Sequence, residues 1–337
     1  MFKPPKLQQF LPPDFRISNP NKSLFHIFNE DDCYALWAAY AAGRPLLVRG
    51  KPGTGKSQMA KAIAEQLGWA FVSEVIRGNT ELSDLHWHFD AIGRLGEAQA
   101  MSSKPGLSET DWEKRMNPKH FLSPGVFWWA YDWESADRQY RTCVNKLRPK
   151  PQFTPNSRVS SLDGVVLLLD EMDKAEPDLP NGLLETLGNY QFTVPYINPD
   201  DENKAFKNPI TADPARLLVV ITTNEERELP TAFVRRCLVH TLRMEESTEK
   251  LGNIEKRYSW LIERGKLHFG DHIAEPVYLR AAELLWTDRT ASTYSRYPPG
   301  LAEYIDLLGA LQSLNHDEQQ QRLEKIASYA LKKELDQ

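Results

Sequence analysis

The chain has 337 residues, of which 41% are hydrophobic and 26% charged, and its formal net charge is −5. This length predicts two domains, or one large domain with additions, and the acidic balance argues against a broad basic surface for nucleic acid or anionic membrane. Three widely separated cysteines, no apolar signal-peptide core and no run that could span a bilayer predict a soluble cytoplasmic protein without a membrane partner.

The N-terminal segment, residues 1 to about 22, is rich in proline and polar residues and predicts an extended arm. Such an arm could lie across a neighbouring domain or subunit, or it could fray as a tail. A helix is predicted from Asn29, which can cap its start, to Gly43, which can end it.

The next stretch predicts a phosphate-binding loop. The apolar residues from Leu46 predict a short strand, and Met59, Ile63 and Leu67 recur at the spacing of a helix. Between them the chain matches G-x-x-x-x-G-K-[ST], in which backbone N–H groups and the helix N-terminus surround phosphate. This motif predicts a nucleoside triphosphate with Mg²⁺, because its lysine reaches the β- and γ-phosphates and its hydroxyl ligates the metal. The candidate binding residues are Gly50, Pro52, Gly53, Thr54, Gly55, Lys56, Ser57 and Gln58.

An insertion is predicted at about residues 87–126, after a strand at residues 70–76, because the sequence there no longer resembles a compact α/β unit. Two interpretations of its tryptophans stand side by side. They could face a partner or substrate as interface anchors, or they could attach the insertion to the body of the domain. These tryptophans, in the insertion or just beyond it, are Trp87, Trp112, Trp128, Trp129 and Trp133.

A second candidate site follows the apolar run VVLLL, Val165 to Leu169, which predicts a central strand buried on both faces. The run ends in Asp170 and Glu171, and ligands of open α/β sheets bind at the carboxyl ends of strands. We therefore predict that Asp170 holds Mg²⁺ through water. Glu171 would polarise the attacking water as a general base.

Three further candidates lie downstream. Asn224 follows a predicted strand at residues 217–221 and could orient the hydrolytic water or simply form a turn. Arg235 and Arg236 come next; one of them could reach the γ-phosphate of an adjacent subunit, although an exposed basic pair is the simpler interpretation. From about Met244 onward, helical periodicity predicts a small α domain, in which Arg296 is a candidate nucleotide contact.

Taken in this order, the stretches resemble the AAA+ ATPases, and within them the MoxR-type family, over roughly residues 25–330. GKPGTGKS resembles the Walker A motif, VVLLLDEMDKA the Walker B motif, VVITTNEE the sensor 1 motif, and LPTAFVRRC the arginine-finger region. The run DEMDKAEPDLPNGLLETLGNYQFTV is similar to the segment that follows Walker B in MoxR-type proteins. This run favours the MoxR type.

The resemblance implies a P-loop α/β domain with a parallel-sheet core, residues 23–245, and an α-helical lid, residues 246–337. It also implies a hexameric ring of identical subunits that hydrolyses ATP to remodel a protein client, often one with a von Willebrand A domain. By motif match, Asn224 is sensor 1 and Arg236 aligns with the finger better than Arg235. Two alternatives are an ATP-dependent assembly switch and a DNA-acting motor. The negative charge and the lack of a dense Lys/Arg stripe argue against the second.

Overall fold

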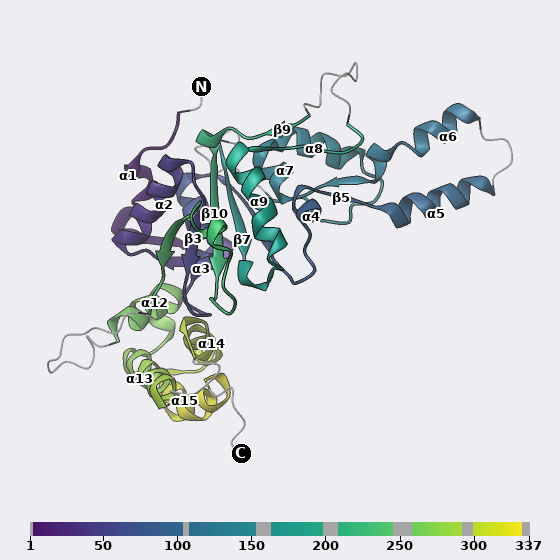
Figure 1. Cartoon of the computed structure of the whole chain (residues 1–337). Coiled ribbons are helices and arrows are strands. Elements are labelled where there is room, and N and C mark those ends of the chain that lie inside the picture. Colours follow the sequence, from purple (N-terminus) through teal and green to yellow (C-terminus); the bar gives the residue numbers. More distant parts are fainter. Residues whose placement is uncertain are drawn as a thin grey trace. The chain divides into compact units, whose positions relative to one another are not determined.

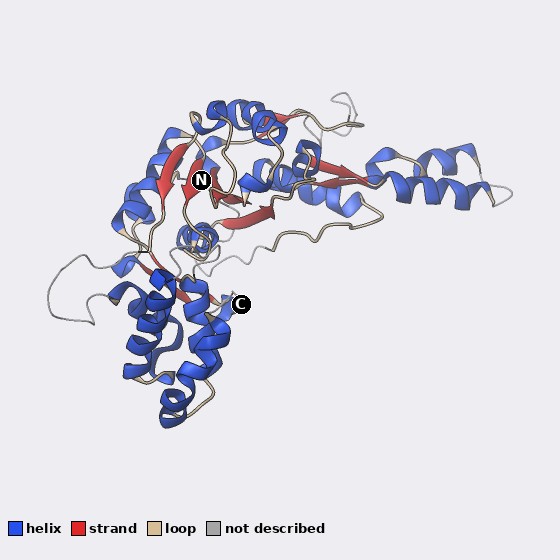
Figure 2. Cartoon of the chain, turned by 60° about the horizontal axis from the view of Figure 1, so that its bottom comes forward, coloured by secondary structure: helices blue, strands red, loops and turns tan. Residues whose placement is uncertain are grey.

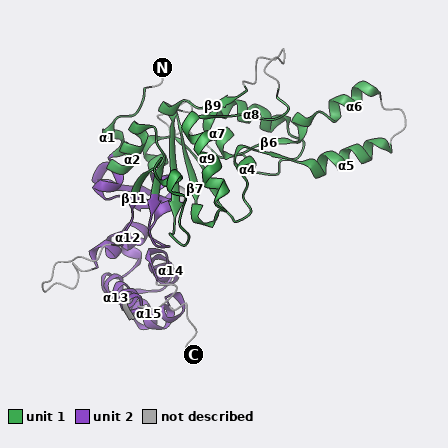
Figure 3. Ribbon diagram, in the orientation of Figure 1, with its two compact units in different colours: residues 1–10, 34–47, 63–239 green, residues 11–33, 48–62, 240–337 purple. Residues whose placement is uncertain are grey.

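A computed structural model of the chain describes residues 3–103, 108–152, 163–197, 208–244, 258–291 and 299–331 (Figure 1). The chain divides into two compact units (Figure 3). One comprises residues 1–10, 34–47 and 63–239, and the other residues 11–33, 48–62 and 240–337. The predicted phosphate loop therefore belongs to the same unit as the C-terminal helices, whereas the predicted domain boundary lies at residue 245; that boundary stays a prediction.

A five-stranded sheet forms the α/β core, and its strand order is β11-β3-β10-β7-β4. Strands β7 and β10 are almost entirely buried and consist mainly of Val, Leu and Ile, as expected for strands covered on both faces. β7 pairs in parallel with β10 and with β4, and the register places Leu169 opposite Ile221. The predicted parallel α/β fold is therefore confirmed. The strands are β3 (Leu46–Arg49), β4 (Ala70–Val75), β7 (Val165–Asp170), β10 (Leu217–Thr223) and β11 (Leu238–Thr241).

The insertion forms a helical arm. Two short antiparallel strands, β5 (Trp87–Phe89) and β6 (Leu122–Pro124), stand at its base. Helices α5 (Ala91–Ser102) and α6 (Glu109–Arg115) run away from these strands in both views (Figures 1 and 2). Most side chains of the two helices are exposed or half-buried, so the arm contributes little to the core.

The tryptophans beyond the insertion belong to the core of the first unit. Trp128 and Trp129 lie on α7 (Val126–Tyr131), which packs against β4 and β7, and both are buried. The indole N–H of Trp128 donates to Ser135 Oγ at 3.1 Å, on α8 (Trp133–Thr142). For these two rings the structure supports attachment to the body, because neither is available at a surface. Trp112, on the arm, remains 37% exposed.

The N-terminal segment is more structured than the predicted extended arm. Helix α1 (Leu7–Phe10) buries Phe10 against Trp37 and Tyr40 of α2 (Glu30–Ala42). In the second unit, β1 (Arg16–Asn19) pairs with β2 (Leu24–Ile27) in a hairpin. The segment therefore forms regular structure. Composition alone does not show this, because Phe10 packs against residues of α2.

Four helices form the core of the second unit: α12 (Ser259–Phe269), α13 (Glu275–Ala291), α14 (Leu301–Leu311) and α15 (His316–Ala330). Their apolar faces meet around buried Tyr278 and Tyr304. This helical part agrees with the predicted α-helical lid. The predicted lid begins at residue 246, and its residues 246–257 lie outside the described residues. Among the described residues, no helix is both long enough and apolar enough to cross a membrane.

The remaining elements of the first unit connect or flank the sheet strands. Helix α9 follows β7 and contacts both α4 and α10. Strands β8 and β9 pair antiparallel before β10 begins. These elements are α4 (Leu82–His86), α9 (Asp178–Asn189), β8 (Gln191–Phe192), β9 (Ile210–Thr211) and α10 (Thr231–Val234).

Candidate functional site

The loop between β3 and α3 (Lys56–Leu67) has the backbone curvature of a phosphate cradle. Gly53 and Gly55 adopt φ angles of +74° and +91°, a region that residues with a Cβ atom rarely enter. These turns let successive N–H groups face the inside of the loop. Because α3 begins at Lys56, Ser57 and Gln58 lie in its first turn, where the helix dipole favours anions.

The Lys56 ammonium group lies within the curve of this loop. Its Nζ donates to the carbonyl oxygens of Gly50 at 2.7 Å and Lys51 at 3.0 Å, and the residue is only 6% exposed. The Thr54 hydroxyl also donates to the Lys51 carbonyl, at 2.9 Å. Pro52 is exposed. An ammonium, a hydroxyl and a helix N-terminus form the donor set that a triphosphate requires, so the residues present fit that ligand.

Helix α14 contacts the phosphate loop within the second unit. The Leu301 N–H donates to the Gly53 carbonyl at 3.1 Å, and Glu303 caps the preceding Gly300 N–H at 2.8 Å. The sequence predicts a nucleotide contact at Arg296, which lies outside the described residues, so that contact stays a prediction.

His26 on β2 also lies beside the loop. Its Cε1 lies 3.8 Å from the point where a Gly55 Cβ would be, and its Nε2 is buried without a hydrogen-bond partner among the described residues. Burial, with the positive charge of Arg264 as a smaller cause, lowers the pKa of His26 to about 3. The Arg264 guanidinium in turn donates to the Ile27 carbonyl at 3.1 Å, which fixes β2 against α12.

The acidic candidates lie at the end of β7, in the first unit. Asp170 is its last residue, and Glu171 follows in the left-handed region with φ 59° and ψ 47°. Such a conformation in a residue with a Cβ costs roughly 1–2 kcal/mol and persists only where neighbouring contacts hold it. Thr222 supplies one such contact, because its Oγ1 accepts the Glu171 N–H at 2.9 Å.

The turn after β10 is bound to the turn after β7. Asn224 begins it, and the Asn224 N–H faces the Asp173 carboxylate at 3.2 and 3.3 Å. Asp173 is buried and also accepts the Glu226 N–H at 3.0 Å. An ion pair between Lys174 and Glu226 joins the same two turns at the surface. The structure therefore brings Asp170, Glu171 and Asn224 to one edge of the sheet.

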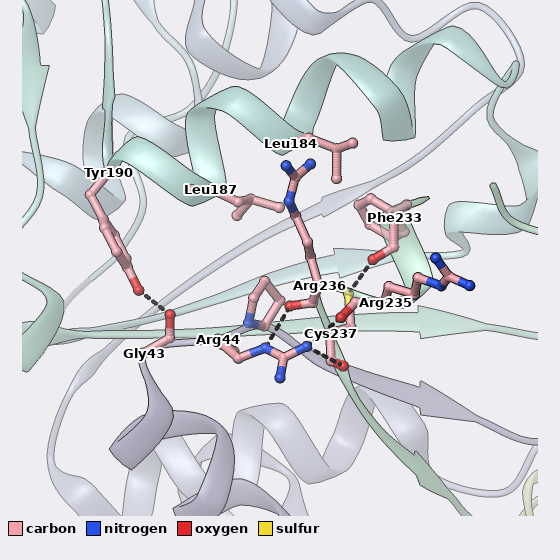
Figure 4. Close-up of a pocket in the computed structure, with 11 residues that line it drawn as sticks. Gly43, Arg44, Leu184, Leu187, Tyr190, Phe233, Arg235, Arg236 and Cys237 are labelled. Carbon is pink, nitrogen blue, oxygen red and sulfur yellow. Dashed lines mark hydrogen bonds between the residues drawn. The ribbon is translucent and has the colours of Figure 1, made fainter. Parts of the chain in front are cut away.

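Arg235 and Arg236 follow α10 and are exposed. Their main chain is held by Arg44, whose guanidinium donates to the carbonyl oxygens of Arg235, Arg236 and Cys237. The arginines border a pocket of about 450 Å³ whose apolar wall includes Leu184 and Leu187. In Figure 4 the Arg236 side chain runs toward these leucines, and the Arg235 side chain points away from them.

Comparison with known protein families shows the family to which this chain belongs. The model of the AAA domain (dynein-related subfamily) matches residues 45–237, more than half of the chain. The chain belongs to this AAA domain family. The matched range of the AAA domain includes the phosphate loop, the acidic residues after β7, Asn224 and both arginines.

No curated protein matches the chain. Among solved structures, a candidate ATPase from Cytophaga hutchinsonii ATCC 33406 is 15% identical, with 89% of this chain and 80% of that chain covered and a TM-score of 0.36. That likeness is too weak to support a residue-level comparison with the AAA domain.

Sequence reasoning missed four residues: His26, which lies beside the phosphate loop in the second unit, and Arg44, Asp173 and Thr222, which hold candidate residues of the first unit. Two of them had a detectable signal. Asp173 lies two residues after Glu171, and Thr222 is the first polar residue after a run of five apolar ones. His26 and Arg44 had no detectable signal, because the residues that they contact are distant in the sequence.

Proposed function

We propose that this protein is a Mg²⁺-dependent ATPase. The observation that carries the proposal is the buried Lys56 ammonium inside a glycine loop at a helix N-terminus, within a matched AAA domain. Lys56 would bind the β- and γ-phosphates, and Ser57 would ligate the metal. When bound, Mg²⁺ neutralises phosphate charge in the transition state. The remaining cradle residues, Gly50 to Gln58, would contribute N–H groups and shape.

The hydrolytic residues are proposed from the contacts that join the turns after β7 and β10. Asp170 would hold the metal through water, and Glu171 would accept a proton from the attacking water. Asn224 would orient that water, and its fixed main chain supports this role. An exposed arginine, Arg236 or Arg235, would stabilise transition-state charge on the nucleotide of an adjacent copy, which requires a homo-oligomer.

We further propose that hydrolysis drives remodelling of a protein client, as in the MoxR type, with a hexameric ring as the working form. The LLETLGNYQFTV run after Walker B supports the MoxR assignment. The exposed arm formed by α5 and α6 offers a surface for a client, since Ile92 is 86% and Leu95 60% exposed. A protein with a von Willebrand A domain is the expected client class by analogy to that family.

The Glu171→Gln variant tests the ATPase proposal. It removes the base and keeps the shape of the side chain, so hydrolysis should fall by about 100-fold or more while a fluorescent ATP analogue still binds. Lys56→Ala should instead weaken nucleotide binding itself. Full hydrolysis by folded, nucleotide-bound Glu171→Gln protein would overturn the assignment.

The client proposal has its own test. Glu171→Gln protein with ATP should retain a von Willebrand A domain protein in affinity capture, and the same protein without nucleotide should not. Hydrolysis that no client stimulates, together with assembly that follows ATP occupancy, would instead support an assembly switch.

A further inference from the structure

Asp173 lies between the two turns that carry the proposed hydrolytic residues. It belongs to a 3₁₀ turn, Met172–Lys174, directly after Glu171, and its side chain is 2% exposed. Its carboxylate accepts main-chain N–H groups from Asn224 and Glu226, more than fifty residues downstream. A buried carboxylate that accepts several N–H groups makes charge-assisted bonds, which are stronger than neutral ones.

The turn that Asp173 holds contains a backbone conformation of high energy. Glu225, between the two donors, has φ +60°, a left-handed conformation that residues with a Cβ atom avoid. One local bond, from the Glu225 N–H to Thr223 Oγ1 at 2.9 Å, supports this shape. Two further main-chain N–H groups of the turn, those of Asn224 and Glu226, donate to the Asp173 carboxylate. That carboxylate therefore helps to set the direction of the Asn224 Cα–Cβ bond.

We propose that Asp173 is a positioning residue for ATP hydrolysis, which sets the placement of Asn224 relative to Glu171. The inference rests on the proposed function. Asp173 itself need not touch nucleotide or water; it orients the residue that would. Because the phosphate loop does not depend on these bonds, loss of Asp173 should slow turnover and leave nucleotide affinity unchanged.

The first test compares Asp173→Ala with Asp173→Asn. The alanine variant removes both acceptor oxygens, and the asparagine variant keeps one of them. We expect kcat to fall by about tenfold or more in Asp173→Ala and to recover substantially in Asp173→Asn, with the dissociation constant of a fluorescent ATP analogue changed less than about twofold. Asp132→Ala is the matched control, because Asp132 also caps a main-chain N–H, that of Ser135, at 3.0 Å.

The second test is a double-mutant cycle with Asn224→Ala. If Asp173 acts through Asn224, Asp173→Ala should lower kcat by less than about twofold once Asn224 is already alanine. A general loss of folding would lower kcat equally in both backgrounds. If Asp173→Ala does not fold, the cycle is run with Asp173→Asn, whose smaller effect must vanish in the same way.

Three outcomes would overturn the inference: unchanged kcat in the single variants, equal losses in both backgrounds, or a loss confined to nucleotide affinity. Failure of the proposed function gives a different result, because the unsubstituted protein would then not hydrolyse ATP at all.

Discussion

The Thr222 hydroxyl donates a hydrogen bond to Asp170 Oδ1, and Thr222 Oγ1 accepts the main-chain N–H of Glu171. One buried side chain on β10 thus holds both acidic residues at the end of β7. The parallel register explains the contact, since it places Thr222 next to the last residue of the neighbouring strand.

Thr222→Val should therefore impair both stability and turnover. Valine has nearly the shape of threonine but no hydroxyl, so the Glu171 N–H loses its acceptor and Asp170 loses a donor. We expect the free energy of unfolding to fall by about 2 kcal/mol and ATP hydrolysis to decrease, measured by chemical denaturation and steady-state assay. Thr222→Ser keeps the hydroxyl and should restore most of both. Equal behaviour of the valine and serine variants would contradict this role.

Arg44→Ala should loosen the segment that carries the candidate finger. Arg44 binds three successive carbonyl oxygens after α10, so its loss removes one set of bonds that hold the main chain of Arg235 and Arg236. We expect slower ATP hydrolysis at concentrations where the protein assembles, with nucleotide affinity unchanged. Arg216→Ala, which removes a half-buried arginine paired with Asp213, is the control. A normal rate in Arg44→Ala would show that the finger does not need this support.

Gln319→Leu should destabilise the helical part of the second unit. Gln319 is fully buried; its Nε2 donates to the carbonyl oxygens of His272 and Leu314, and its Oε1 accepts the Ala274 N–H. Leucine leaves these groups unsatisfied, so we expect a loss of about 3 kcal/mol in the free energy of unfolding. Thermal unfolding measures the change. Gln321→Leu, at an exposed position of the same helix, should change it by less than about 0.5 kcal/mol.

The stability of the first unit should depend on pH through His86. Its ring stacks on Phe192 with centroids 4.4 Å apart, its Nε2 bonds to Thr186, and burial lowers its pKa from 6.5 to about 4. The pKa of His86 is lower in the folded state than in the unfolded state. The contribution of the neutral, buried His86 ring to stability is therefore complete above about pH 6.5 and is lost as the pH falls toward 4. At pH 5 the loss should be about 2 kcal/mol.

His86→Phe provides the comparison, because phenylalanine can stack but does not titrate. Between pH 7.5 and pH 5, the unsubstituted protein should lose more unfolding free energy than the variant does. A constant difference across that range would rule out His86 as the titrating group.

Much of the fold could be predicted from the chain because the signals were local. The helix predicted from Asn29 to Gly43 is observed as Glu30–Ala42, and the apolar run from Val165 is the buried strand β7. Prediction was less successful at the N-terminus, where the short helix α1 depends on the burial of Phe10 against α2. The Trp128 and Trp129 rings could not be assigned either, since composition does not distinguish a core ring from an interface ring.

The sequence alone determined the phosphate loop and the acidic end of β7, because glycine spacing and an apolar run that ends in carboxylates are patterns of neighbouring residues. Only the tertiary structure decided how these parts are held. Asp173 reaches Asn224, Thr222 reaches Asp170, and Arg44 reaches the main chain of Arg236 across long stretches of sequence. Such bonds depend on which strands become neighbours in the sheet, and strand order is a property of the whole packed chain.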